Sequence, residues 1–145
     1  MAHQYVIGID IGTQGTKAAL FDTEGICRAE GFHSSDLIKP KPGVVEEVAE
    51  DQVSAVCAAV RQCMDGSGVS ADKIAALGID GQMAGIIGIG SDGRAVTPYD
   101  SWLDTRCAKW IEVIKSEAED EIIEKTGGPP SFNHGPKIRR WKHQH

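Results

Sequence analysis

Long apolar runs are missing from this chain, and so is a basic segment ahead of an apolar one near its start. No stretch approaches the roughly 18 apolar residues that a membrane span needs, and the opening Met-Ala-His-Gln carries no basic residue of the kind that starts an export signal. We therefore expect a cytoplasmic protein without a membrane partner.

Metal-ligand and disulfide spacings are missing from the cysteines. The cysteines are Cys27, Cys57, Cys63 and Cys107, and they form no CxxC or Cys/His ligand pattern. Because a cytosolic environment keeps thiols reduced, we expect free thiols that are buried or partly buried. His3, His33 and His134 are isolated as well, so no metal site is expected from histidine.

Basic residues are outnumbered, with 15 Lys and Arg against 21 Asp and Glu and a formal net charge of -6. An acidic protein is repelled by nucleic acid unless its basic residues cluster strongly. One basic run, Lys137 to Lys142, lies near the end of the sequence. We interpret it as the solvated face of a helix whose buried side is Ile138 and Trp141, and we expect no nucleic-acid partner.

The residues that are present suit one α/β domain, since 41% of the 145 residues are hydrophobic. Apolar, β-branched runs at 5–11 and 17–22 flank the turn residues 12–15 and predict a β-hairpin, which residues 26–34 extend as a third antiparallel strand. A helix is predicted from about residue 48. Its expected buried face has three- and four-residue spacing and consists of Val53, Val56, Cys57, Val60 and Met64.

The second half of the chain also contains predicted strands followed by predicted helices. Apolar runs at 74–80 and 86–89 predict strands, and 104–115 and 116–125 predict helices. Gly135-Pro136 opens a last helix, since proline is tolerated in a first turn. This order predicts a ribonuclease-H-like half-domain, in which three antiparallel N-terminal strands belong to a mixed sheet with helices packed on it.

The turn of the predicted hairpin carries the chemistry of a magnesium–phosphate site. The Asp10 carboxylate suits Mg²⁺, which prefers oxygen ligands, while Thr13, Thr16 and Lys17 offer hydroxyl donors and a positive charge. The segment is not a Walker A loop, because it lacks the GxxxxGK spacing and precedes a strand. A plain hairpin with the same turn residues is the alternative. We call this segment, residues 8–17, the phosphate hairpin; it reads Gly8-Ile9-Asp10-Ile11-Gly12-Thr13-Gln14-Gly15-Thr16-Lys17.

Three further motifs follow the phosphate hairpin. They are LGIDGQMAG at 77–85, SWLDTRC at 101–107, and a stretch from Thr126-Gly127 through Pro136-Lys137 to Trp141. Together, and in this order, they resemble the FGGY carbohydrate kinases, the group containing xylulokinase, glycerol kinase and gluconokinase; the corresponding xylulokinase segments are GQMHG, LWxDxRC and TGxxxxxxxxPKxxW. The match covers nearly the whole chain.

This resemblance implies transfer of phosphate from ATP, with Mg²⁺, to a hydroxyl of a sugar or polyol, in a cleft between two actin-like domains. It implies that Asp10 is the catalytic residue that serves the metal and the phosphate. The residues that line the phosphates are then Gly12, Thr13, Gln14, Gly15, Thr16 and Lys17, and those on the sugar side are Gln82, Met83, Ala84, Trp102 and Asp104.

Two features bear on the expected activity. Ala84 stands where the xylulokinase motif has His, so one polar contact to the sugar is missing, which argues against xylulose itself. The family's general base and adenosine pocket have no counterpart in this chain. We therefore expect residues 1–145 to be an incomplete N-terminal portion of the first kinase domain, inactive by itself.

The sugar-side residues also have simpler interpretations. A flat aromatic face under C–H groups and a carboxylate acceptor for hydroxyls would bind a carbohydrate, and Trp102 with Asp104 offers that pair. An interior aromatic residue is the alternative for Trp102, and a helix N-cap is the alternative for Asp104.

Two other functional classes stay open at this point. Asp10 and Asp80 end separate apolar runs, and in a ribonuclease-H-like nuclease they would hold a pair of metal ions. A non-catalytic remnant is the other alternative. Its uncovered apolar face would favour self-association into a homo-oligomer.

Overall fold

The computed structural model describes residues 4–144, which form two compact units. The first unit comprises the chain up to Asp36 together with Val48–Gln82, and the second comprises Leu37–Glu47 and the chain from Met83 onward. Within the described part, no helix is both long enough and apolar enough to cross a membrane.

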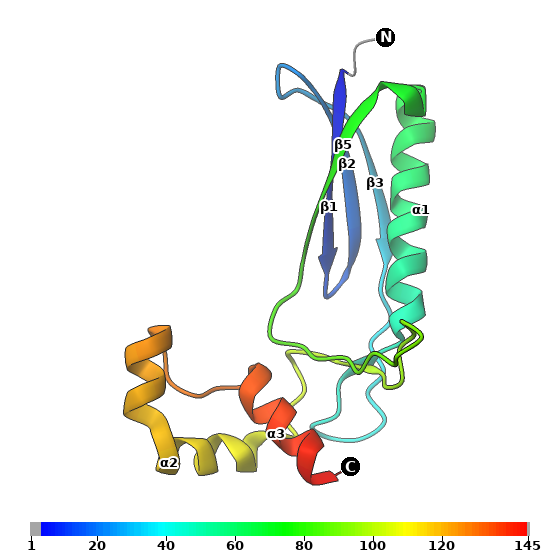
Figure 1. Ribbon diagram of the computed structural model, residues 1–145. Helices are drawn as coiled ribbons and strands as arrows, with labels where there is room; N and C mark the ends of the chain where they lie inside the picture. Colours follow the sequence, from blue (N-terminus) through cyan, green and yellow to red (C-terminus); the bar gives the residue numbers. More distant parts are fainter. Residues whose placement is uncertain (1–3, 145) are drawn as a thin grey trace. The chain divides into compact units, whose positions relative to one another are not determined.

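A four-stranded sheet is the centre of the first unit (Figure 1). Its order is β3-β2-β1-β5; β1 pairs antiparallel with β2 and β2 with β3, whereas β1 and β5 are parallel. The predicted α/β class, with three antiparallel strands first in a mixed sheet, is therefore confirmed. The strands are β1 (Tyr5–Gly12), β2 (Gly15–Asp22), β3 (Cys27–Ser34) and β5 (Ile74–Gly81), with a short 3-10 helix, η1 (Ala71–Lys73), before β5.

Helix α1 (Ala49–Ser67) packs along β2 and β3 on one face of this sheet (Figure 1). The core between them consists of Ile7, Ile9, Ala18, Leu20, Ala59 and Cys63. The helix does not reach across β5, where Leu77 and Ile79 are 58% and 64% exposed. These two side chains share a face with Ile7 and Ile9, because the residues pair in register. An uncovered apolar strip therefore lies along β5.

The helix α1 turns a different face to the sheet than its sequence predicts. Val53 is 65% exposed and Cys57 is exposed, so the prediction that they are buried is wrong. The fully buried positions are the small residues Ala55, Ala59 and Cys63, with Val56, Val60 and Met64 partly buried beside them.

The close approach of α1 to β3 explains why this face of the helix is buried. A Cβ atom added to Gly31 of β3 would lie 2.1 Å from the Ala59 carbonyl oxygen and 2.8 Å from the Cys63 nitrogen. Backbone packs directly on backbone there, so only small helix residues fit at the contact.

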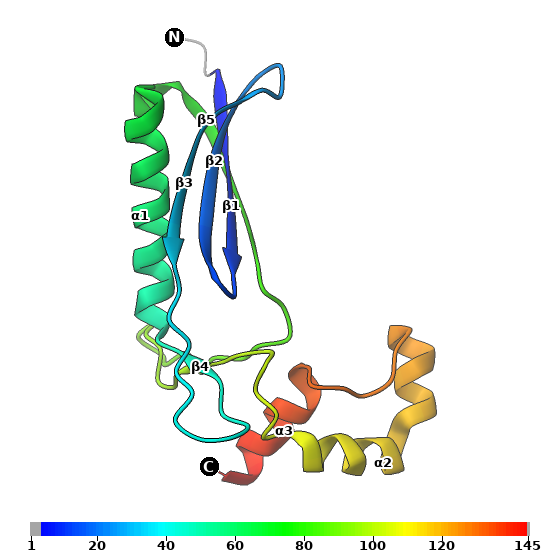
Figure 2. The same ribbon diagram turned by 180° about the vertical axis from the view of Figure 1, so that it is seen from behind.

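The second unit contains a two-stranded ribbon and two helices (Figure 2). Strands β4 (Glu46–Glu47) and β6 (Tyr99–Asp100) pair antiparallel. Helix α2 (Ala108–Thr126) starts later than predicted and is interrupted at Ala118, close to the predicted boundary between two helices. Helix α3 is His134–Gln144. The strand predicted at 86–89 is wrong; Ile86 and Ile89 form only isolated bridges, since the glycines at 88 and 90 interrupt the run.

Helix α3 buries charged residues instead of apolar ones. Ile138 is 50% exposed, whereas Lys137 and Arg140 are 0% and 3% exposed. The prediction that Ile138 lies on the buried side is therefore wrong, and Trp141 is only half-buried. Buried charges persist when each has a partner. Lys137 bonds backbone carbonyl oxygens in the loop between β6 and α2, and Arg140 bonds Asp100 at the end of β6.

Candidate functional site

The phosphate hairpin forms a two-residue turn, because Gly12 pairs with Gly15 and leaves Thr13-Gln14 as the loop. A depression of about 470 Å³ opens at this turn. Asp10, near the end of β1, lies directly opposite Lys17 of β2, and both side chains are exposed. The depression is lined by Asp10, Gly12, Thr13, Gln14, Gly15, Lys17 and Phe32.

Glycine is required at Gly15, and a side chain at Gly12 would be tight. A Cβ atom on Gly15 would lie 2.4 Å from the His33 carbonyl oxygen and 2.5 Å from the Phe32 ring. On Gly12 it would lie 3.1 Å from the Gly15 carbonyl oxygen and 3.8 Å from Oδ2 of Asp10. The bare backbone therefore leaves room beside the Asp10 carboxylate for a ligand of phosphate size.

Thr13 and Gln82, predicted for the phosphate side and the sugar side, are brought together. The Thr13 hydroxyl donates to Oε1 of Gln82 over 3.1 Å, and the Gln82 N–H donates to the Ile11 carbonyl oxygen over 2.9 Å. The hairpin is thus tied to the residue that follows β5.

Thr16 points away from the depression. Its side chain is 0% exposed, and within the described residues its hydroxyl has no hydrogen-bond partner. A contact between this hydroxyl and a phosphate remains a prediction that the geometry does not support, because the strand alternation that places Lys17 at the surface places Thr16 inside.

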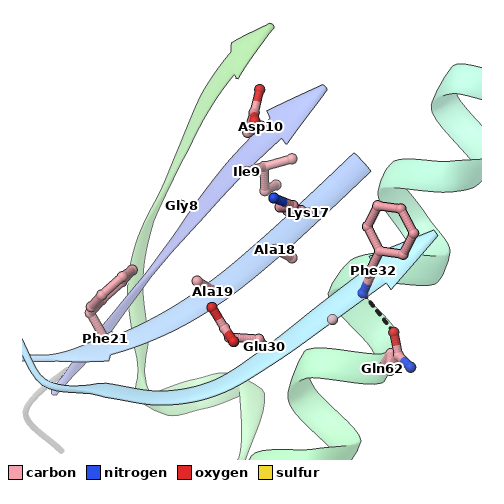
Figure 3. Close-up of a pocket in the computed structure, with 11 residues that line it drawn as sticks. Gly8, Ile9, Asp10, Lys17, Ala18, Ala19, Phe21, Glu30, Phe32 and Gln62 are labelled. Carbon is pink, nitrogen blue, oxygen red and sulfur yellow. Dashed lines mark hydrogen bonds between the residues drawn. The ribbon is translucent and has the colours of Figure 1, made fainter. Parts of the chain in front are cut away.

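A second, larger depression of about 600 Å³ adjoins the first and shares Asp10, Lys17 and Phe32 with it (Figure 3). Phe32 is held in place by its N–H, which donates to Oε1 of Gln62 over 2.6 Å. Sequence reasoning missed Phe32. The signal was available, since the predicted third strand places this aromatic residue opposite Lys17.

Asp80 lies beside Asp10 on the neighbouring strand, as the nuclease alternative requires, because the two residues pair in register. Its carboxylate accepts the Gly81 N–H over 2.8 Å. A nuclease also requires further ligands, and residues 4–144 contain no group of three or more His, Cys, Asp or Glu side chains arranged to hold a metal ion.

The phosphate hairpin does fit a magnesium ion that arrives with a phosphate. Mg²⁺ is held in proteins by one or two carboxylates plus waters and phosphate oxygens. Asp10 would supply the carboxylate, and the glycine turn with Lys17 would face the phosphates. When bound, the metal would neutralise charge on the phosphate oxygens.

The remaining sugar-side candidates belong to the second unit. Met83 is 80% exposed and Trp102 is 46% exposed. Ala84 has a φ of 66°, a left-handed conformation that is uncommon for residues other than glycine but is more frequent for histidine than for most residues. The backbone at this position therefore suits the His of the xylulokinase motif.

Trp102 occupies a tight turn, Ser101–Asp104, which we call the Trp102 turn. The Asp104 N–H donates to the Ser101 carbonyl oxygen over 2.9 Å, so Trp102 and Leu103 are its two central residues. The turn follows β6 directly.

Asp104 itself is fully buried, and its carboxylate is occupied. Oδ2 accepts the Val45 N–H over 2.9 Å and Nε of Arg106 over 2.8 Å, and Oδ1 accepts the Arg106 N–H over 3.0 Å. Burial alone raises the pKa of Asp104, but these hydrogen bonds outweigh burial and hold the pKa below its ordinary value. Direct contact of Asp104 with a sugar remains a prediction that this geometry does not support. It does not cap α2 either, since the N-cap is Cys107.

A network of ion pairs extends from Asp104 through the second unit. Arg106 also contacts Glu46 at 2.6 Å and Oδ1 of Asp100 at 2.8 Å, while Arg140 of α3 bonds Oδ2 of Asp100. Sequence reasoning missed this network. Glu46 and Arg140 are far in the sequence from the other members, and the only local signal is the two acids and one base within residues 100–106.

Comparisons with known proteins identify the family of this chain. Residues 5–145 match the sequence pattern described as "FGGY family of carbohydrate kinases, N-terminal domain". The glycerol kinase of Deinococcus radiodurans is 30% identical over 126 residues, which are 86% of this chain and 25% of the relative. The xylulose kinase of Bacillus subtilis is 34% identical over 123 residues, 85% of this chain and 25% of the relative.

A solved structure shows the same fold. The crystal structure of xylulose kinase from Rhodospirillum rubrum matches with a TM-score of 0.89 at 23% identity, covering 98% of this chain and 29% of that one. The chain thus spans only about a quarter of the length of the curated relatives it matches. The resemblance seen in the four motifs is confirmed, and the chain belongs to the FGGY family of carbohydrate kinases.

Proposed function

We propose that this chain supplies the magnesium–phosphate site and part of the sugar site of a cytoplasmic kinase that transfers the γ-phosphate of ATP to a sugar or polyol. The observation that carries the proposal is the depression at the phosphate hairpin, where a carboxylate, a cation and a bare glycine turn converge in a member of this family. On this proposal residues 1–145 are an incomplete part of the first kinase domain.

The proposal gives each residue of the depression a role. Asp10 would hold Mg²⁺, and Lys17 with the backbone of Gly12–Gly15 would face the phosphates, since these residues line the depression. Phosphoryl transfer depends chiefly on such positioning and charge stabilisation. Gln82, Met83, Ala84 and Trp102 belong to the sugar side, and the substrate class is a pentose, ketose or polyol.

Titration of the isotopically labelled chain with MgATP tests the phosphate site. The amide signals of residues 12–17 should shift, and Asp10→Asn should weaken MgATP binding about tenfold or more, because a hydrogen-bonded or metal-bound charge is lost. Asp80→Asn is the matched control, since it removes the neighbouring carboxylate on the same strand pair and should leave binding unchanged. Equal effects of the two substitutions would contradict the assignment of Asp10.

Activity separates this function from its alternatives. We expect no ATP-dependent turnover by the 145-residue chain with glycerol or xylulose in a coupled assay. Robust turnover that disappears in Asp10→Ala would overturn the expectation that this chain is incomplete. Metal-dependent cleavage of nucleic acid that is lost in both Asp10→Asn and Asp80→Asn would instead favour the nuclease, and absence of any MgATP binding would favour a non-catalytic remnant.

A further inference from the structure

Lys137 is the most deeply buried charged side chain of α3, with 0% of its surface exposed. Its ammonium group donates to the Ser101 carbonyl oxygen over 2.8 Å and to the Asp104 carbonyl oxygen over 3.0 Å. These are the first and last carbonyl groups of the Trp102 turn. One side chain therefore bridges the two ends of the turn that presents Trp102.

The bond to Ser101 reinforces the turn directly. The Ser101 carbonyl oxygen already accepts the Asp104 N–H at 2.9 Å, so the ammonium group uses the second lone pair of the same oxygen. Without Lys137, two buried carbonyl groups would lose a charged donor, and such losses are costly in a dry interior.

The electrostatic surroundings of Lys137 leave its ammonium group to the backbone of the turn. Burial lowers the pKa of Lys137, and the nearby carboxylates of Asp100 and Asp104 act in the opposite direction. Asp100 is already paired with Arg106 and Arg140. Lys137 is therefore directed at backbone oxygens of the turn, while the two arginines neutralise the acids.

We propose that Lys137 is a positioning residue for sugar binding, which fixes the Trp102 turn so that the exposed indole ring has one orientation. The inference rests on the proposed function, because it assigns Trp102 to the sugar side. Lys137 acts through the turn and does not contact the substrate.

Fluorine NMR of the chain labelled with 5-fluorotryptophan tests the proposal, since the sequence has three tryptophans and each gives its own signal. Trp102→Phe assigns the signal of Trp102. In Lys137→Met, which keeps the length of the side chain but removes its donors, the Trp102 signal should broaden or divide while that of Trp110 stays unchanged. Lys142→Met is the matched control, because Lys142 is an exposed lysine of the same helix.

Sugar binding gives the second readout. In saturation-transfer NMR with glycerol and xylulose, Lys137→Met should weaken binding about tenfold, the scale expected when a binding group is displaced by a fraction of an ångström to an ångström. If the wild-type chain binds neither compound but the Trp102 signal still changes in Lys137→Met, the assignment of Trp102 to a site for these two compounds fails while the positioning role stands. An unchanged Trp102 signal in folded Lys137→Met would overturn the positioning role.

A folding defect is separated by a second variant. Lys137→Arg keeps the charge and the donors, so a folded Lys137→Arg with a single Trp102 signal supports the proposal where Lys137→Met does not fold. If neither variant folds, Lys137 serves the folding of the whole second unit, and its specific role in the turn is contradicted.

Discussion

Tyr99 illustrates how much a single residue constrains the loop next to the sugar-side candidates. Its side chain is 9% exposed, and its hydroxyl has no hydrogen-bond partner in the part of the chain that the structure describes. A Cβ atom on Gly85 would lie 2.0 Å from that hydroxyl oxygen. Burial, together with the charges of Glu47 and Asp100, raises the pKa of Tyr99 to about 12.

Tyr99→Phe should therefore stabilise the protein and change its response to alkali. Removing a buried hydroxyl without a partner should raise the free energy of unfolding at pH 7 by about 1 kcal/mol. The folded-state pKa lies above the unfolded value near 10, so the wild type keeps its full stability with respect to this ionisation below pH 10. Its free energy of unfolding then falls by about 2–3 kcal/mol as the pH rises from 10 to about 12, because the phenolate that forms in the unfolded chain is disfavoured in the buried site. Urea unfolding at several pH values measures both effects.

The decisive quantity is the difference in free energy of unfolding between Tyr99→Phe and wild type, measured as a function of pH. Tyr5→Phe serves as the control for loss of a half-buried tyrosine. A constant difference from pH 9 to pH 12 would show that Tyr99 is not the titrating group.

At the scale of elements, the hairpin and the three α-helices could be predicted, but the short 3-10 helix η1 and the inward faces of two α-helices could not. Turn residues at 12–15 and alternating strands are local signals, and they sufficed for β1 and β2. The inward face of α1 depends on Gly31 of another element. The inward face of α3 depends on carbonyl groups at 101 and 104. Hydrophobic periodicity treats lysine and arginine as surface residues. It therefore predicted Ile138 on the buried face of α3, where the structure has Lys137 and Arg140.

Part of the candidate site could also be predicted from the sequence, and part could not. Asp10, Lys17 and the glycine turn meet because they are close in sequence. The burial of Asp104 could not be foreseen, since its partner Val45 is 59 residues away. A sequence motif marks a position as important without saying whether it touches a ligand or a neighbouring backbone.

Helix α1 offers a direct test of the face that the structure assigns. Ala59→Leu should lower the free energy of unfolding by about 1–3 kcal/mol, because overpacking a close contact forces backbone shifts. Val53→Ser, at an exposed position of the same helix, should change it by no more than about 0.5 kcal/mol. Urea unfolding followed by circular dichroism compares the two. If Val53→Ser lowered the free energy of unfolding more than Ala59→Leu does, the buried face of α1 would be the one predicted from periodicity.

At the scale of the whole molecule, the two units each contain one fully buried thiol. Cys63 belongs to the first and Cys107 to the second, and burial raises the pKa of both. Cys27 and Cys57 are exposed, contrary to the expectation that all four are buried or partly buried. Thiol reactivity therefore reports on each unit separately.

In a background of Cys27→Ser and Cys57→Ser, we expect Cys63 and Cys107 to react with a thiol reagent only after local or global opening. Gly31→Ala should speed the reaction of Cys63 and leave Cys107 protected, because the added methyl group would collide with the backbone of α1. Arg140→Met should speed the reaction of Cys107 and leave Cys63 protected, because it leaves the buried Asp100 carboxylate with one cation fewer. Mass spectrometry identifies which thiol has reacted. Equal acceleration of both thiols by either substitution would show that the units open together.

The contacts made by Gly31 and Gly85 have a consequence for how this chain can vary. At both positions the space of the first side-chain carbon is already taken, by the backbone of α1 in one case and by the Tyr99 ring in the other. A library selected only for folded protein should therefore return glycine alone at position 31. At position 85 it should return alanine only together with a smaller residue at position 99. Position 31 should therefore accept no substitution, whereas positions 85 and 99 should change only together.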